Sequence, residues 1–236
     1  MSAIYFKTMR REFYEPGKII DTSKINYGFE AGRFSAGYAA MLDTIIEISK
    51  ETACGFEALI VFAIKASSAQ LPPGLDGDLR SSGRYVDLTE HLYGKRGPRI
   101  HTSQLRQLYH QAIRCDFNVP MPTIAVRLWE HLYERVRADH RCERPRRLDS
   151  FFACRDELSI IKYQRRHGLG QIICQVDAEH CDLIFASDMT VLDRVSEESC
   201  YETALPQIIN YWDQKHSDDP IIEVMLQGKV RLLDEV

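Results

Sequence analysis

Glu223 stands alone as a charged residue in an apolar segment, Ile221-Ile222-Glu223-Val224-Met225-Leu226. The branched residues predict a strand, in which side chains alternate between two faces, so Glu223 shares a face with Ile221 and Met225. A carboxylate on an apolar face costs free energy unless it is paired or lines a cleft. Glu223 is therefore either an edge-strand residue facing water or a functional carboxylate in a cleft.

A second candidate group is Ser150-Phe151-Phe152, which precedes a helix predicted from about Arg155 to His167. A serine at the end of a strand either bonds to the local backbone or positions a ligand. Adjacent phenylalanines are usually core residues, although an aromatic face can also stack on a ligand ring. Both interpretations stay open for each of the three residues.

Three basic residues lie near the N-terminus, where Lys7, Arg10 and Arg11 lie within or just after a predicted strand, Ile4–Thr8. Arginine can bind a phosphate through two parallel hydrogen bonds. A denser basic cluster, either a solvated helix end or an anion-binding rim, comes later in the chain. Its members are Arg135, Arg137, Arg141, Arg144, Arg146 and Arg147.

The elements that must position these residues fall into three stretches. The first strand is followed by a turn at Glu15–Lys18, and by helical periodicity from Phe34 to Ala69 with a break near Thr52 to Gly55. Residues 71–99 are rich in glycine and proline and predict mostly loop, with a short helix near 87–93. Further amphipathic helices are predicted over 104–113 and 124–137.

The C-terminal stretch alternates strands and helices. Two strands are predicted, over 171–177 and 182–187, and then a helix over 199–214. Residues 221–226 and 229–233 predict a hairpin around Gln227-Gly228. We therefore expect an α+β fold, as a single domain over 1–236 with a helical insertion at about 34–141.

Composition narrows the class of protein. The 236 residues carry a net charge of −4, which disfavours nucleic acid as a partner. No apolar run reaches the roughly 18 residues that span a bilayer, so no membrane partner is expected. Seven cysteines, an odd number without a C-x-x-C pair, argue against a disulfide framework and a structural zinc site. These features are typical of a cytoplasmic protein, which a dedicated secretion system could still export to a host cell.

Three blocks of the sequence resemble the ADP-ribosyltransferase superfamily. They are Ile4-Tyr5-Phe6-Lys7-Thr8, then Arg146-Arg147-Leu148-Asp149-Ser150-Phe151-Phe152-Ala153-Cys154, then Pro220 to Val230 around Glu223. From Arg144 onward the chain is also similar to a bacterial family of unknown function with this fold, including a tryptophan-containing helix before the glutamate strand. The resemblance implies an ADP-ribosyltransferase-like split β-sheet core carrying the helical insertion.

The resemblance also implies roles for particular residues. Glu223 would be the catalytic carboxylate that stabilises the cationic ribose of NAD, the substrate, without a metal. The residues implied in NAD binding are Tyr5, Lys7, Arg10, Ser150, Phe151 and Phe152. Where the histidine class has Tyr-His-Gly-Thr, this chain has Tyr5-Phe6-Lys7-Thr8, so Lys7, Arg10 and Arg11 all remain candidates for the cation that anchors NAD.

The function implied is NAD-dependent mono-ADP-ribosyl transfer to a macromolecular acceptor. A protein is the expected acceptor, at a residue other than arginine, because position 221 is Ile where arginine-modifying members have Gln or Glu. Ubiquitin threonine is one such acceptor within the superfamily. The alternatives are a binding module of the same fold without catalysis, and an NAD glycohydrolase. A Cys-His hydrolase lacks any local signature here.

Overall fold

The computed structural model describes residues 3–26, 36–81, 83–115, 121–167, 172–196 and 198–236. The predicted positions Phe34 and Gln171, at which a helical stretch and a strand were expected to begin, lie outside these residues. The chain forms two compact units, and each is described by itself. The first unit comprises residues 1–33, 134–194 and 207–236, and the second comprises 34–133 and 195–206.

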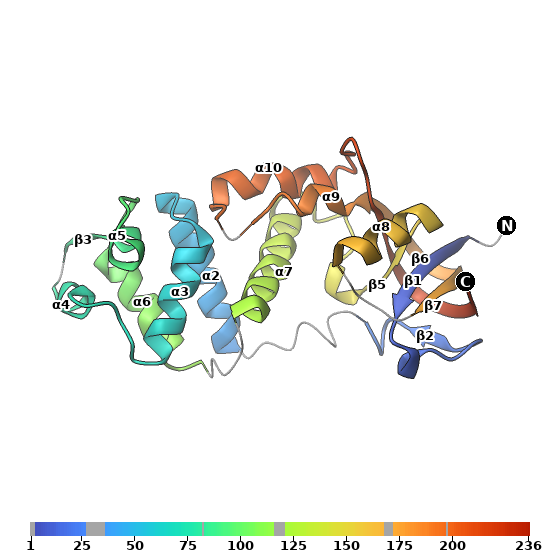
Figure 1. Cartoon of the computed structure of the whole chain (residues 1–236), viewed down its shortest axis with the longest axis horizontal. Helices are drawn as coiled ribbons and strands as arrows, with labels where there is room; N and C mark the ends of the chain where they lie inside the picture. Colours follow the sequence, from blue (N-terminus) through green and yellow to red (C-terminus); the bar gives the residue numbers. More distant parts are fainter. Residues whose placement is uncertain (1–2, 27–35, 82, 116–120, 168–171, 197) are drawn as a thin grey trace. The chain divides into compact units, whose positions relative to one another are not determined.

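The first unit is built on five antiparallel strands (Figure 1). They are β1 (Ile4–Met9), β2 (Ile19–Asp21), β5 (Phe151–Cys154), β6 (Ile172–Asp188) and β7 (Ile222–Glu235). Strand β1 pairs with β6, β6 with β7, β7 with β5, and β5 with β1 through Phe6 and Cys154. These four strands therefore form a closed circuit, and β2 adds to the outer edge of β7.

Alternation along the strands separates an apolar interior from an outer face. Val224, Leu226, Val230 and Leu232 of β7 all belong to one buried cluster with residues of the neighbouring strands. Because successive side chains of a strand point to opposite faces, Glu223 belongs to the other face of β7. The carboxylate is thus held on the outer surface of the strand circuit, where helices of the same unit cover it.

Short helices and the end of a longer one cover that outer face. They include η2 (Arg147–Asp149), α8 (Glu157–His167), α9 (Met189–Leu192) and the C-terminal part of α10 (Tyr201–Trp212). Tyr211 and Trp212 are fully buried, and the Trp212 ring lies 5.8 Å from the ring of Phe185 on β6. A 3-10 turn, η1 (Arg11–Phe13), follows β1. The aromatic end of α10 is therefore the element that brings a polar hydroxyl close to the outer face of β7.

The second unit is mainly helical. Its elements are α2 (Ala36–Thr52), α3 (Phe56–Ser67), α4 (Leu75–Arg80), α5 (Leu88–Tyr93), α6 (Thr102–Ala112), most of α7 (Met121–His140) and a small sheet of β3 (Tyr85–Asp87) with β4 (Arg99–His101). The predicted break between two helices near Gly55 is present. The expectation that residues 71–99 are mostly loop was wrong, because α4 and β3 lie within them.

Across the described ranges, no helix is long and apolar enough to cross a membrane.

The predicted hairpin at Gln227-Gly228 was wrong, because β7 continues through both residues. Gly228 has a φ of 121°, and an added Cβ would approach the carbonyl oxygen of His180 to 2.8 Å. Glycine is needed at this position because the backbone of β6 approaches closely, and not because the chain turns.

The two strands predicted over 171–177 and 182–187 are one strand, β6, in the structure. Its pairing with β7 is interrupted by register shifts between Asp177 and His180 and between Cys181 and Leu183. These irregularities bend a continuous strand without ending it. Glu179, His180 and Asp182, between and at the edge of the two predicted strands, are exposed on this continuous strand. The observed class is therefore mixed α and β, as expected, and the main sheet is antiparallel.

Candidate functional site

Glu223 lies near the start of β7, paired with Cys154 of β5 on one side and with Ser187 of β6 on the other. Its side chain is buried, with only 8% of the residue exposed. A buried carboxylate without partners would cost several kcal/mol, so its surroundings must supply donors or a positive charge. The interpretation of Glu223 as an edge-strand residue facing water does not fit this position.

Two donors converge on one oxygen of this carboxylate. Arg147 Nη1 donates to Glu223 Oε1 at 2.5 Å, and the Tyr211 hydroxyl donates to the same oxygen at 2.6 Å. Arg147 Nη1 also donates to the Tyr211 oxygen at 2.6 Å. All three side chains are buried, so the three polar groups satisfy one another away from water.

Aromatic rings hold the Arg147 guanidinium in place. Its central carbon lies 4.7 Å from the centroid of the Phe152 ring and 5.3 Å from that of the Tyr211 ring. A guanidinium over ring faces gains cation–π attraction, which increases when water is excluded. Phe152 and Tyr211 therefore favour the position from which Arg147 reaches Glu223.

A cavity of about 160 Å³ opens beside this group, and both Arg147 and Glu223 line it. The cavity combines a carboxylate, two cations, two hydroxyls, aromatic rings and apolar side chains. Its lining residues are Lys7, Thr8, Arg147, Phe152, Ala153, Cys154, Ile160, Tyr163, Met189 and Glu223. A few polar groups set among apolar and aromatic surfaces are the usual composition of a small-molecule site.

Two other acidic groups of the cavity stay protonated at neutral pH. Burial raises the pKa of the Cys154 thiol to about 12, and the negative charge of Glu223 adds to the rise. Burial, again helped by Glu223, raises the pKa of the Tyr163 hydroxyl to about 12. Since a thiol rather than a thiolate is a poor nucleophile, Cys154 is not suited to covalent catalysis.

The residues predicted to bind NAD divide between the cavity and the buried cluster of the strand circuit. Lys7 and Phe152 line the cavity with Glu223. Tyr5 and Phe151 pack against the buried cluster of the strand circuit. Lys7 Nζ lies 5.3 Å from the centroid of the Phe151 ring, so Phe151 contacts the site through Lys7.

Ser150 is fully buried, and its hydroxyl donates to the backbone oxygen of Arg146 at 2.8 Å. The same hydroxyl accepts a hydrogen bond from Gln227 Nε2 at 3.1 Å. Ser150 is not among the residues that line the cavity. Its contacts fix the segment that leads into β5, which matches the local-backbone interpretation.

Neither arginine after β1 contacts Glu223 in the structure. The Arg10 side chain is 70% exposed and lies 3.9 Å from Glu12. Arg11 makes two hydrogen bonds to Glu235, at 3.2 Å and 2.7 Å. The cations brought to Glu223 are instead Arg147, by direct contact, and Lys7, as part of the cavity wall.

Sequence reasoning missed Arg147, Tyr211 and Tyr163 as site residues. Arg147 stood in the basic cluster and in the block that carries the resemblance, three residues before Ser150. Tyr211 directly precedes the tryptophan of the helix before the glutamate strand. No local signal distinguished Tyr163 from other tyrosines, because its position depends on how α8 packs over β5.

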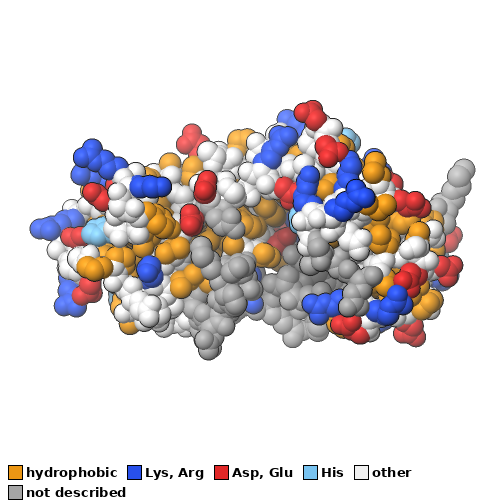
Figure 2. All heavy atoms as spheres, viewed as in Figure 1, with side chains coloured by type: hydrophobic (Ala, Val, Ile, Leu, Met, Phe, Trp, Pro, Cys, Tyr) orange, Lys and Arg blue, Asp and Glu red, His pale blue; other side chains and the backbone are white. Residues whose placement is uncertain are grey.

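The basic cluster is largely internal to the first unit. Arg137 donates to both oxygens of Glu134, and Arg141 donates to both oxygens of Asp213. Arg146 contacts Glu134 at 3.1 Å. On the face shown in Figure 2, acidic side chains lie among the basic ones. Of the cluster, Arg147 is the member that lines the cavity.

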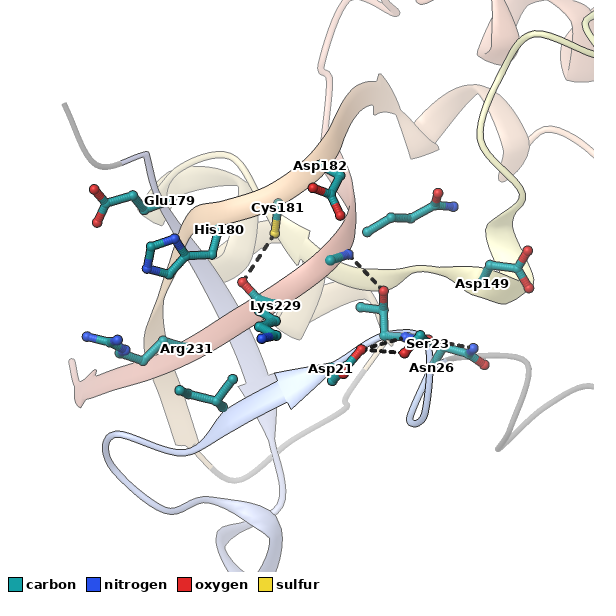
Figure 3. Close-up of a pocket in the computed structure, with 14 residues that line it drawn as sticks. Asp21, Ser23, Asn26, Asp149, Glu179, His180, Cys181, Asp182, Lys229 and Arg231 are labelled. Carbon is teal, nitrogen blue, oxygen red and sulfur yellow. Dashed lines mark hydrogen bonds between the residues drawn. The ribbon is translucent and has the colours of Figure 1, made fainter.

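A second, larger hollow of about 1,090 Å³ is open to solvent and lies on β2, β6 and β7 (Figure 3). Charged side chains of both signs surround it, and it lacks the aromatic walls of the cavity. Its charged lining residues are Asp21, Asp149, Glu179, Asp182, Lys229 and Arg231, and the His180 side chain also lines it. We call this hollow the polar groove. Its exposed carboxylates are less suited than Glu223 to chemistry that needs exclusion of water.

Within the described part of the chain, no group of three or more histidine, cysteine, aspartate or glutamate side chains is arranged to hold a metal ion. Comparison of the sequence with protein-family models and with curated proteins found no match. The site is therefore interpreted from its own geometry.

Proposed function

We propose that this protein is an NAD-dependent mono-ADP-ribosyltransferase in which Glu223 is the catalytic carboxylate. The observation that carries the proposal is a buried carboxylate on the wall of a small, partly aromatic cavity, next to two cations. A carboxylate, an aromatic face and a cation are the groups that cleavage of a nicotinamide–ribose bond requires.

The proposed reaction breaks the bond between ribose C1′ and the nicotinamide nitrogen. The bonding electron pair leaves with nicotinamide, which becomes neutral, and positive charge develops over C1′ and the ring oxygen, as in glycoside cleavage. Glu223 stabilises that charge electrostatically. A lone pair of the acceptor then forms the new bond to C1′, and the acceptor releases its proton to solvent. The products are nicotinamide, the ADP-ribosylated acceptor and one proton.

The size of the cavity supports binding of one end of the dinucleotide. At about 160 Å³ it is smaller than typical ligand sites of roughly 300–1,000 Å³. The nicotinamide and its ribose would enter the cavity, with Phe152 and Tyr163 as aromatic surfaces. The adenosine end would remain outside. Exclusion of water from the reacting end would strengthen the effect of Glu223.

The fold is compatible with the proposal. An early strand (β1), a middle strand followed by a helix (β5 and α8) and a late strand with the glutamate (β7) come in the order that the resemblance implies. The helical unit over 34–133 is additional to the strand circuit. We propose that it recognises the acceptor, which we expect to be a protein modified at a residue other than arginine, with ubiquitin threonine as one acceptor to test.

The test is nicotinamide release from NAD by the purified full chain, with and without cell lysate. Release that requires lysate, with labelled ADP-ribose appearing on protein, would support the transferase. We expect Glu223→Gln to reduce release at least about 100-fold, the scale for loss of an electrostatic transition-state contact. Glu179→Gln is the matched control, since Glu179 is exposed on β6. Undiminished release by Glu223→Gln would exclude the assigned role.

One observation favours an alternative. Because Arg147 neutralises Glu223, the carboxylate as observed is less able to stabilise a ribosyl cation, which suits a binding module without catalysis. A thermal shift with NAD but no nicotinamide release would identify the module. A glycohydrolase would instead produce free ADP-ribose without any acceptor protein.

A further inference from the structure

The charges around the cavity are unequal. Among the described lining residues, Lys7 and Arg147 are cationic and Glu223 is the carboxylate. Cys154 and Tyr163 add no negative charge at neutral pH, because burial raises the pKa of each to about 12. Two cationic side chains and one carboxylate thus line the cavity, and an anionic group of a ligand would be attracted to the cations.

The position of Arg147 suits it to bind that anionic group. Its guanidinium is buried against Phe152 and Tyr211, so the side chain is preorganised and loses little freedom on binding. Arginine forms parallel hydrogen bonds with phosphate oxygens as readily as with a carboxylate. A phosphate and Glu223 would therefore compete for the same guanidinium.

We propose that Arg147 is an anion-binding residue that exchanges Glu223 for a phosphate of the ligand. Under the proposed function, on which this inference rests, the ligand group is the phosphate next to the nicotinamide ribose. Glu223 would keep its hydrogen bond from Tyr211 and become available to the ribose. Arg147 would remain paired throughout, and Glu223 would exchange the guanidinium for hydrogen bonds from Tyr211 and the ribose.

This exchange would make the site select ligands that carry a phosphate next to the ribose over ligands that lack one. A ligand with a phosphate next to the ribose, such as NAD or nicotinamide mononucleotide, would displace Glu223 from Arg147. Nicotinamide riboside has no phosphate, so it would meet a neutralised carboxylate. The anion-binding cation is then supplied by η2 rather than by Arg10 or Arg11.

The first test measures binding of inorganic pyrophosphate to the full chain by calorimetry, without any reaction. Competition predicts that Glu223→Gln binds pyrophosphate more tightly than the unmodified protein, and that Arg147→Lys binds it less tightly. Each change is expected to be about tenfold, the scale of a charge-assisted hydrogen bond. Arg231→Met, which removes a cation of the polar groove, should leave the affinity unchanged.

Several results would overturn the assignment of Arg147. They are absence of pyrophosphate binding, loss of binding in Arg231→Met rather than in Arg147→Lys, and an affinity of Glu223→Gln no higher than that of the unmodified protein. A purely structural Arg147–Glu223 pair would give no tighter binding in Glu223→Gln. This measurement does not depend on whether Arg147→Lys folds, because the comparison of the other two proteins is sufficient.

The second test compares nicotinamide release from NAD, nicotinamide mononucleotide and nicotinamide riboside. The exchange predicts release from the two phosphate-containing substrates at least about tenfold faster than from the riboside. Equal rates would overturn it. If the pyrophosphate results hold but no substrate releases nicotinamide, the proposed reaction is wrong and the anion site stands. If nicotinamide is released but the pyrophosphate results are not obtained, the proposed reaction stands and the anion site at Arg147 is wrong.

Discussion

The hydroxyl of Tyr211 at the end of α10 lies 2.6 Å from the carboxylate of Glu223 near the start of β7. The loop between α10 and β7 reverses the chain direction, so that Tyr211 at the end of the helix can donate a hydrogen bond to Glu223 near the start of the strand. Asp188 fixes the conformation of this loop, because its carboxylate accepts hydrogen bonds from the backbone nitrogens of Ser217 and Ile221.

Replacement of Tyr211 by Phe should destabilise the protein by about 1–2 kcal/mol. The substitution keeps the ring but removes one donor to Glu223 Oε1 and one acceptor for Arg147. Urea unfolding followed by circular dichroism would measure the change. Tyr85→Phe is the control, since Tyr85 is 64% exposed. Equal unfolding free energies for the two variants would contradict a stabilising role for the hydroxyl.

Cys154 should resist alkylation in the folded protein at pH 8. Its pKa of about 12 leaves almost no thiolate, and its side chain is buried. Cys142 is exposed and should react with iodoacetamide first. Mass spectrometry of peptides after short labelling would separate the two sites. Labelling of Cys154 as fast as Cys142 would mean that the thiol is accessible and ionised.

Stability should fall in alkaline solution because Tyr163 must release its proton. The pKa of Tyr163 is 10.0 in the unfolded chain and about 12 in the folded one, so the unfolded state ionises first. The contribution of Tyr163 is therefore fully present below pH 10 and is lost as pH rises toward 12. Melting temperatures of Tyr163→Phe should decline less steeply over this window than those of the unmodified protein.

Asp188 should make stability sensitive to acid. Burial alone would raise its pKa, but hydrogen bonds from the hydroxyl and amide of Ser217 and from the amides of Ile221 and Thr190 outweigh it and lower the pKa. The stabilisation is present above the ordinary pKa of 3.8 and is lost as pH falls below it. Asp188→Asn should be less stable at pH 7 and should show a flatter decline in acid. A parallel acid decline in both proteins would contradict this.

Gly228→Ala should cost more stability than Gly17→Ala. Both glycines have positive φ, at 121° and 80°, so both substitutions carry backbone strain of about 1–3 kcal/mol. Only at Gly228 would the new Cβ meet backbone atoms, at 2.8 Å from the His180 oxygen, whereas nothing lies within 4 Å at Gly17. Guanidinium unfolding of both variants would test this order. Equal losses of unfolding free energy in the two variants would mean that β6 can shift away from the new Cβ at no cost in stability.

Much of the secondary structure could be predicted because its signals are local. The apolar residues of 36–67 recur at helical spacing, and the break near Gly55 separates α2 from α3 in the structure. Glu223 could be singled out for a similar reason, because a lone carboxylate in an apolar strand is visible without knowing its neighbours. Its burial and its partners could not be predicted in this way.

The wrong prediction of a hairpin has a physical cause. Gln227-Gly228 has the composition of a turn, but strands β2 and β6 pair with β7 on both sides and keep it extended. For Arg10 and Arg11, which the resemblance offered as candidate cations, the structure shows the surface carboxylates Glu12 and Glu235 as ion-pair partners.

The sequence by itself therefore determined the periodicity of the helices, the apolar strand around Glu223 and the candidate carboxylate, since each depends on residues a few positions apart. Only the tertiary structure decided which cation Glu223 meets. Arg147 and Glu223 are 76 positions apart in the chain, and closure of the strand circuit together with the packing of α10 brings them to 2.5 Å. No local pattern encodes a contact that arises when separate elements bury their apolar faces against one another.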